Sequence, residues 1–498
     1  MSRLTPSTAL PSVARARGDV RLAEVIGALT YALDLTEGQR PGHTLRTTLI
    51  AMRLADDLGL DGDTRGALYY AALLKDSGCS SNAARMAALF GSDDQELKRS
   101  MRLVDWHDKF RLAMRTARNC GVGRHPFPRI RPFPAVARTP AFTREIIQTR
   151  CERGAQIAQV LGFPRATSDA ILYVDEHWCG VGHPFGIAGD EIPLLSRILL
   201  LAQTVEAYWS ENGVRAALDM AKARRGTWFE PRLVDLMRKW HNDQAWWARL
   251  ADFDRLDESV VALEPSSTPL VATDERLDRI SHAFAAVIDA KTPFTARHST
   301  NVARYAVGIV SAMGSDLADT RQVLRAGLLH DIGKLGVSNR ILDKPDKLTD
   351  EEFATIRKHP QWTKDILDHV SAFRHFAPDA ARHHERLDGR GYPWRIEGEQ
   401  LSYTARVLAV ADVYEALSAT RPYRAGLPVQ TVVDIMARDR GTAFDPQVFD
   451  AAVALAESGT LADLSQVTEV GFEALHALVP HPHLPSHAAE AAHRSSAA

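Results

Sequence analysis

The chain has 498 residues, which at about 150 residues per domain predicts about three domains or two large ones. Apolar residues make up 45% of the sequence and charged residues 24%, a balance typical of soluble globular proteins and not of mainly disordered ones. The 60 basic residues are offset by 62 acidic ones, so the net charge of −2 favours neither nucleic acid nor an anionic membrane as a partner.

Three features predict a cytoplasmic protein without a membrane span. The most apolar run, IPLLSRILLLAQTVEAYW, is interrupted by Arg197 and so lacks the uncharged stretch of about 18 residues that a span needs. The first residues include arginines but no continuous apolar segment typical of a secretion signal. The four cysteines, at positions 79, 120, 151 and 179, form no CxxC pair, which favours reduced thiols.

Helical periodicity runs through most of the chain, and strand signals are sparse. Apolar residues spaced three and four apart recur in five segments, which are residues 26–33, 48–59, 292–314, 323–333 and 432–437. Thr349 and Glu352 have the spacing of a capping box, which predicts a helix start just before residues 353–359. We therefore expect an all-α fold.

Breaks in this pattern suggest the domain boundaries. Pro, Ser and Thr interrupt the helical spacing near residues 258–273, and the last stretch is rich in Ala and His. We predict a helical domain over 20–250, a linker over 251–273, a second helical domain over 274–460 and a disordered tail over 461–498.

The two predicted domains are related in sequence. An offset of 255 aligns His43 with His298 and Asp76 with Asp331; an offset of 209 aligns EHWCGVGHP with ERLDGRGYP, and an offset of 215 aligns GTWFEP with GTAFDP. Such constant offsets predict a duplicated helical domain. The first copy carries about 46 additional residues between 77 and 149, including the segment RHPFPRIRPFP.

The second copy gathers residues that suit a metal. Asp331 and Asp412 share helix faces with apolar residues, where an ionised carboxylate is costly unless a cation compensates it. Imidazole and carboxylate ligands together suit Fe, Mn, Co or Zn. The alternative is that each Asp pairs with an arginine and each His is a polar residue of the domain interior without a ligand role. The candidate ligands are His298, His330, Asp331, His359, His383, His384 and Asp412.

Three motifs in this copy resemble the HD-GYP family of metal-dependent phosphohydrolases. They are HDIGK at 330–334, HHERLDGRGYP at 383–393 and ADVYEALSATRPYR at 411–424. The resemblance covers about 280–455 fully and 20–250 as a degenerate HD domain. It implies tandem all-helical bundles and hydrolysis of cyclic di-GMP to a linear dinucleotide or GMP.

The resemblance also implies residue roles. His298, His330, Asp331 and Asp412 would hold one ion, and His359, His383 and His384 a second ion that Asp331 shares. The cofactors would be two divalent transition-metal ions per chain, Fe or Mn. A water molecule between them would lose a proton, and the resulting hydroxide would attack phosphorus in line. Asp331 and Lys334 would be catalytic. The residues expected to contact the nucleotide are Lys334, Gly391, Tyr392, Pro393, Arg421 and Arg424.

Three positions depart from the family pattern. Phe294 stands where some members have a Glu ligand, so we expect two metals and not three. Thr363 replaces a usual Gly and Glu415 a usual Asp, and neither change removes a ligand.

The first copy has lost most of the ligand set. Only His43 and Asp76 remain, whereas the other positions hold Lys75, Arg150, Val174, Asp175 and Gln203. We expect this copy to be catalytically silent, as a sensor, dimerisation platform, ligand-binding module or scaffold. One hypothesis is that the Lys75 ammonium replaces the lost metal charge beside Asp76.

Two alternatives to a cyclic di-GMP phosphodiesterase stay open. The metals could serve another cyclic dinucleotide or a nucleotide phosphomonoester, although generic HD phosphohydrolases lack the GYP and RPYR segments. The chain could also be a non-catalytic nucleotide-binding signalling protein, against which the complete ligand set argues. No helix-turn-helix signature or basic stripe indicates DNA binding, and a homodimer is possible.

Overall fold

The computed structural model describes residues 20–90, 93–104, 140–265, 270–293, 295, 297–344, 346–421 and 424–466. Within these ranges the regular structure is helical, with isolated β-bridges and no strand, which confirms the predicted all-α fold. None of the described helices combines the length and apolar character that crossing a bilayer requires. Phe294, the Pro/Arg-rich segment 124–134 and residues 467–498 of the predicted tail lie outside the described residues. The prediction that the disordered tail begins at residue 461 is wrong, because residues 461–466 belong to a helix that packs against the second domain.

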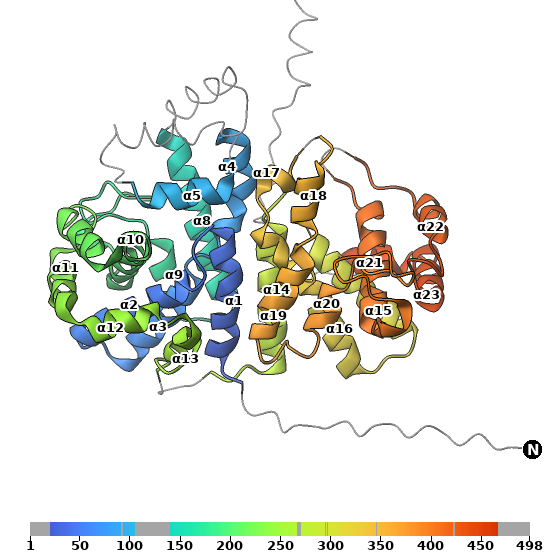
Figure 1. The fold of residues 1–498 in the computed structure, drawn as a ribbon, viewed down its shortest axis with the longest axis horizontal. Coiled ribbons are helices and arrows are strands. Elements are labelled where there is room, and N and C mark those ends of the chain that lie inside the picture. Colours follow the sequence, from blue (N-terminus) through green and yellow to red (C-terminus); the bar gives the residue numbers. More distant parts are fainter. Residues whose placement is uncertain are drawn as a thin grey trace, which may run out of the picture.

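Residues 20–265, called here the first half, form one group of helices, coloured blue to green in Figure 1. These are α1 (Leu22–Thr36), α2 (His43–Leu58), α3 (Gly62–Leu74), α4 (Ala83–Phe90), α5 (Asp94–Arg102), α8 (Pro140–Val160), α9 (Arg165–Leu172), α10 (Leu194–Ala223), α11 (Pro231–Arg238), α12 (Gln244–Ala251) and α13 (Leu256–Val261).

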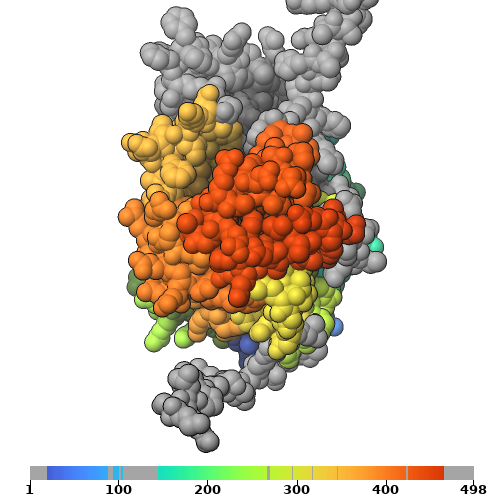
Figure 2. All heavy atoms as spheres, turned by 90° about the vertical axis from the view of Figure 1, so that its right-hand side faces the viewer, coloured from blue at the N-terminus to red at the C-terminus, as the bar shows by residue number. Residues whose placement is uncertain are grey.

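Residues 270–466, the second half, form the yellow to red group, whose outer face is seen in Figure 2. The helices are α14 (Asp274–Asp289), α15 (His298–Ala312), α16 (Leu317–Leu329), α17 (Asn339–Leu342), α18 (Asp350–Ile356), α19 (His359–His369), α20 (Ala377–Ala381), α21 (Tyr403–Ser418), α22 (Val429–Ala437), α23 (Pro446–Glu457) and α24 (Thr460–Gln466). A short 3₁₀ turn, η6 (Ile332–Gly336), follows α16.

Local sequence signals explain several helix starts. The Thr349 side chain accepts from the backbone N–H of Glu352 at 3.3 Å, and the Glu352 carboxylate accepts from the Thr349 N–H at 2.8 Å. Both bonds satisfy amides that the first turn of α18 leaves without helical partners. The predicted capping box is therefore confirmed.

The predicted linker is only partly irregular. Residues 256–261 form α13, whose Leu256 and Val260 are buried, and this helix packs against α1 and α2. Leu270 then accepts a backbone hydrogen bond from Leu22 at 2.7 Å. The sequence did not predict α13, because this helix is stabilised by apolar contacts with helices distant in sequence.

Equivalent contacts recur in the two halves. The Thr44 hydroxyl donates to the buried Asp34 carboxylate at 2.6 Å, and the Ser299 hydroxyl donates to the buried Asp289 at 2.7 Å. Each pair holds the start of the helix that carries the first histidine of its copy, α2 or α15. The recurrence supports the predicted duplication.

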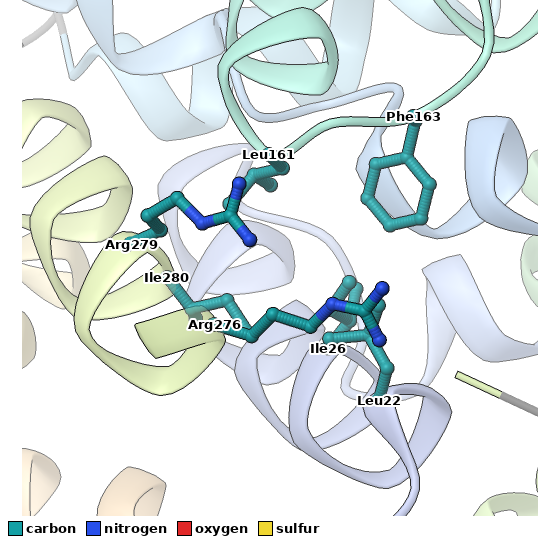
Figure 3. Close-up of a pocket in the computed structure, with 7 residues that line it drawn as sticks. All are labelled: Leu22, Ile26, Leu161, Phe163, Arg276, Arg279 and Ile280. Carbon is teal, nitrogen blue, oxygen red and sulfur yellow. The ribbon is translucent and has the colours of Figure 1, made fainter. Parts of the chain in front are cut away.

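The halves meet along α1, which packs against α19 and η6. Figure 3 shows part of this boundary, where Leu22 and Ile26 of α1 face Ile280 of α14. The side chains of Arg276 and Arg279 extend from α14 along the same seam, so their aliphatic stems cover apolar surface.

A buried polar contact also joins the halves. Asp94, at the start of α5, accepts from the Asn339 N–H at 2.9 Å and from the Ser338 hydroxyl at 3.2 Å. The ammonium of Lys291 lies 3.9 Å from the same carboxylate, and both side chains are almost fully buried. The second half therefore depends on Asp94 to satisfy one of its own buried amides and to face a buried charge.

We predict that Asp94→Ala lowers the free energy of unfolding by about 2–4 kcal/mol, because it leaves buried donors without their acceptor. Thermal unfolding of the full chain measures the effect. Glu96→Ala, an exposed acid on the same helix, is the control and should leave the Tm nearly unchanged. Equal Tm values for the two variants would contradict a structural role for Asp94.

Candidate metal centre

Side chains from five parts of the second half converge on one buried point. His298 begins α15, His330 and Asp331 follow α16, and His359 begins α19. His383 and His384 follow α20, and Asp412 lies within α21. The structure thus brings all the predicted ligands together. Three overlapping sets have ligand atoms within 4.8 Å of one another, namely His298/His330/Asp412, His330/Asp331/His383 and His359/His383/His384.

Asp331 lies at the centre of this cluster. Its Oδ2 atom is 3.4 Å from the Nε2 atoms of both His298 and His330. Its Oδ1 atom is 3.3 Å from His359 Nε2 and 3.6 Å from His383 Nε2. One carboxylate therefore faces four imidazoles, two at each oxygen, as a residue shared between two ions would.

The backbone orients three of these imidazoles. Each Nδ1 atom donates to a carbonyl three residues earlier, at 2.6 Å for His330, 2.8 Å for His359 and 2.7 Å for His383. With the proton on Nδ1, Nε2 presents a lone pair toward the centre, as metal-binding histidines require. The buried His330 Nε2 and Asp331 Oδ1 atoms have no hydrogen-bond partner among the described residues, so this donor set fits a cation.

Burial favours the neutral, ligating form of several imidazoles. It lowers the pKa of His359 and holds the pKa of His383 well below its usual range. It also lowers the pKa of His384 to about 3. His298 differs: burial opposes its charge, but the carboxylates of Glu415, Asp331 and Asp412 together raise the pKa of His298 well above its usual value.

Two positions described from the sequence only as departures support the ligands. Glu415 Oε2 lies 2.5 Å from His298 Nδ1 and so turns the His298 Nε2 atom toward Asp331. The Thr363 hydroxyl donates to the His330 carbonyl at 2.9 Å and accepts from the Gly333 N–H at 3.0 Å. The position of Glu415 three residues after Asp412, on the same helix face, is a sequence signal that could have revealed its role.

The GYP segment lies against the cluster. The Tyr392 ring stacks on His384 with centroids 4.7 Å apart, and the Arg357 guanidinium lies 4.8 Å from the Tyr392 centroid. Gly391 is required here, because a Cβ atom would lie 2.5 Å from Glu385 Cα. Pro393 follows Tyr392 through a cis peptide bond. Sequence reasoning missed Arg357, which belongs to none of the motifs.

Glu385 holds the backbone of this segment. Its side chain is buried and accepts from the N–H groups of Trp394 at 2.8 Å and of Arg395 and Ile396 at 3.1 Å. These bonds fix the chain that follows Tyr392. Glu385 was not among the predicted site residues, although it lies within the motif HHERLDGRGYP.

The three predicted cationic contacts differ in their surroundings. Lys334 donates to Asp331 Oδ2 at 2.5 Å and keeps a partly exposed side chain. Arg421 lies 3.8 Å from Glu415 Oε2, at the edge of the cluster. Arg424 donates to the Ala416 carbonyl at 2.6 Å, which satisfies the end of α21. A substrate contact by Arg421 or Arg424 stays a prediction.

The corresponding region of the first half holds cations of its own. The Lys75 ammonium donates to Asp76 Oδ2, as hypothesised, and lies 3.3 Å from His43 Nε2. Arg102 was not anticipated: its Nη1 lies 2.8 Å from His43 Nε2 and its Nη2 donates to Asp76 Oδ1 at 3.2 Å.

One further cluster in this half has metal-binding donor types. Glu37, Asp76 and Cys79 lie close together, but Lys98 and Arg102 approach Glu37 at 3.0 Å and 2.7 Å. Side-chain cations therefore already compensate these carboxylates.

Comparison with known proteins agrees with the geometry. A model of the HD domain matches residues 138–233 and 282–448. The chain is also 40% identical, over 86% of its length and 93% of the relative, to 3'3'-cGAMP-specific phosphodiesterase 3 of Vibrio cholerae. The chain belongs to the HD-GYP family. It is accordingly a hydrolase of the phosphodiesterase type, as the resemblance predicted.

A solved structure and one further relative agree with this assignment. The crystal structure of a V. cholerae cyclic GMP-AMP-specific phosphodiesterase, V-cGAP3, matches with a TM-score of 0.62 and 36% identity, over 89% of this chain and 98% of that one. A cyclic di-GMP phosphodiesterase of Pseudomonas aeruginosa is 41% identical over 35% of this chain and 43% of its own length.

We predict that Glu385→Ala lowers the Tm and reduces phosphodiesterase kcat/KM at least tenfold, because three partly buried backbone N–H groups lose their acceptor and Tyr392 loses its support. Glu385→Gln, which keeps one acceptor oxygen, should fall between this variant and the unmodified chain. Glu399→Ala, an exposed acid in the same region, is the control. A Glu385→Ala enzyme as stable and active as the control would show that these bonds are dispensable.

Proposed function

We propose that the second half hydrolyses a 3'3'-linked cyclic dinucleotide at the Asp331 cluster. The observation that carries the proposal is the buried Asp331 carboxylate, which faces four imidazole nitrogens within 3.6 Å and contacts Lys334. No simpler structural role accounts for so many buried and oriented imidazoles around one carboxylate.

Two transition-metal ions fit this donor set. His298, His330, Asp331 and Asp412 are the proposed ligands of one, and His359, His383 and His384, with Asp331, those of the other. The mixture of imidazole and carboxylate suits Fe or Mn better than Mg or Ca. When bound, such ions supply Lewis acidity to a phosphodiester and make water a better nucleophile.

The chain's own residues bind and orient the substrate. The charge of Asp331 raises the pKa of Lys334 although burial opposes it, so this ammonium remains protonated and can donate to a phosphate oxygen. Tyr392 and Arg357 together present an aromatic face and a cation beside the cluster, an arrangement on which a purine base can stack. The Glu385 bonds keep this face in place.

Two substrates have specific support. The relative similar over 86% of this chain is named for 3'3'-cGAMP, which makes this hybrid dinucleotide the first candidate. Cyclic di-GMP is the second, since it is the substrate implied by the motifs and named for the P. aeruginosa relative. Both present the same 3'–5' phosphodiester to the Asp331 cluster and differ in one base.

We predict that the full chain, purified anaerobically and loaded with Mn²⁺ or Fe²⁺, hydrolyses 3'3'-cGAMP with a higher kcat/KM than cyclic di-GMP. Asp331→Asn should lower kcat at least 10³-fold, because the central carboxylate loses its charge. Asp368→Asn, which breaks a surface ion pair with Lys364, is the matched control.

The outcomes of this assay separate the candidates. A higher kcat/KM for cyclic di-GMP than for 3'3'-cGAMP would make cyclic di-GMP the preferred substrate. Turnover of neither cyclic dinucleotide by the metal-loaded chain would contradict the proposal and direct the search to nucleotide phosphomonoesters.

We predict that the purified chain binds about two transition-metal ions and that chelation lowers its Tm. When the metal is returned at a free concentration 100 times its dissociation constant, it should stabilise the fold by about 2.7 kcal/mol. Elemental analysis of His383→Ala should show fewer ions per chain, whereas His241→Ala, at an exposed position, should not change the content. Unaltered metal content in His383→Ala would contradict the ligand assignment.

A further inference from the structure

The first half contains a pocket where the second half has its metal cluster. It has a volume of about 480 Å³, including the part open to solvent, and its lining includes Arg102, Arg150, His177, Gln203 and Trp228. By the sequence offset of 209, Arg150 corresponds to His359 and Gln203 to Asp412. The pocket, called here the arginine pocket and defined by these five residues, therefore occupies the position of a former active site.

A guanidinium group lies where a metal ion would have its ligands. Arg102 contacts His43 Nε2 at 2.8 Å and Asp76 Oδ1 at 3.2 Å, the counterparts of His298 and Asp331. A guanidinium group retains the positive charge and adds N–H donors that fit phosphate oxygens, but it cannot activate water as a metal does. Such a site can hold a phosphate ester without cleaving it.

The rest of the pocket offers a second cation and an aromatic wall. Arg150 forms an ion pair with Asp175, and its side chain is 22% exposed, so it can approach a ligand. The His177 and Trp228 rings stack with centroids 3.9 Å apart, and the Arg224 guanidinium lies 4.2 Å from the Trp228 centroid. Aromatic and guanidinium faces of this kind stack on nucleobases.

We infer that the arginine pocket binds a purine nucleotide phosphate and does not hydrolyse it. The cyclic dinucleotide and its linear hydrolysis product share this chemistry and are the two sources to distinguish. This inference goes beyond the proposed catalytic function, since it concerns the half that lacks the ligand set and does not depend on turnover.

Helix α5 connects the arginine pocket to the catalytic turn. Arg102 ends this helix, and at its start Asp94 binds Asn339 while the Gln95 amide donates to the Leu335 carbonyl at 3.2 Å. Leu335 directly follows Lys334. A ligand that displaces Arg102 therefore acts on a helix that holds the Lys334 turn, which gives the bound nucleotide a route to alter turnover.

The test measures binding to the full chain in an Asp331→Asn background, where hydrolysis does not interfere. Arg102→Ala risks misfolding because it removes a partner of two buried carboxylates, so Gln203→Glu is the informative substitution. It adds a negative charge inside the arginine pocket with almost no change in shape. Gln159→Glu adds the same charge at an exposed position of the first half and is the control.

Equilibrium dialysis with 3'3'-cGAMP, cyclic di-GMP, the linear dinucleotide and inorganic phosphate then gives the result. We expect Gln203→Glu to remove one bound nucleotide per chain or weaken it at least tenfold, and Gln159→Glu to leave it unchanged. The tighter of the cyclic and linear ligands identifies the source. Equal binding by both variants, or binding of inorganic phosphate as tight as of any nucleotide, would overturn the inference.

A second readout tests the connection through α5. In the catalytically active chain, Gln203→Glu should shift the concentration at which added linear dinucleotide changes turnover, whereas Gln159→Glu should not. Identical concentration curves would refute the coupling. Either binding result leaves the proposed function untouched, because that function is decided by turnover of the unmodified chain.

Discussion

Burial of one carboxylate governs the second half of this protein. Asp331 is fully buried, where an ionised group is stable only if cations and donors surround it. Lys334 and four imidazoles supply that environment. Burial opposes the charge of Asp331, but Lys334, His330 and His298 together hold the pKa of Asp331 well below its usual range. The backbone bonds that orient the histidines, the close turn at Gly333 and the position of Glu415 all keep the imidazoles beside this one carboxylate.

The two halves solve the same burial problem in different ways. Around Asp76 the compensation is internal, since Lys75 and Arg102 are the cations. Around Asp331 the Lys334 cation is joined by four imidazoles, and burial favours the neutral form of His359 and His383, which leaves their ligand atoms available to an ion. In the first half, side-chain cations thus stand where the second half has candidate metal ligands, while the carboxylate and its helices remain.

The supporting contacts survive this exchange. Glu206 contacts His43 just as Glu415 contacts His298. Glu176 accepts from the Phe185 N–H at 2.6 Å, as Glu385 does from Trp394. Fold and reactivity are therefore carried by separate residues, and the first half keeps a shaped pocket after its ligands are gone.

Much of this arrangement was predictable from the sequence. The helices, the capping box at Thr349 and the seven clustered ligands follow from local periodicity and motif spacing. The contacts of Arg102 with His43 and Asp76 could not be predicted in this way. Helix α5 lies in a stretch without a counterpart in the second half, and these contacts depend on tertiary packing. Arg357 and α13 were missed for the same reason: their surroundings are set by residues far away in the chain.

Anomalous diffraction from crystals of the manganese-loaded chain would test the central claim most directly. The account predicts two anomalous peaks around Asp331 in the second half and none between His43 and Asp76, where Arg102 lies. A peak in the first half, or none at Asp331, would contradict it.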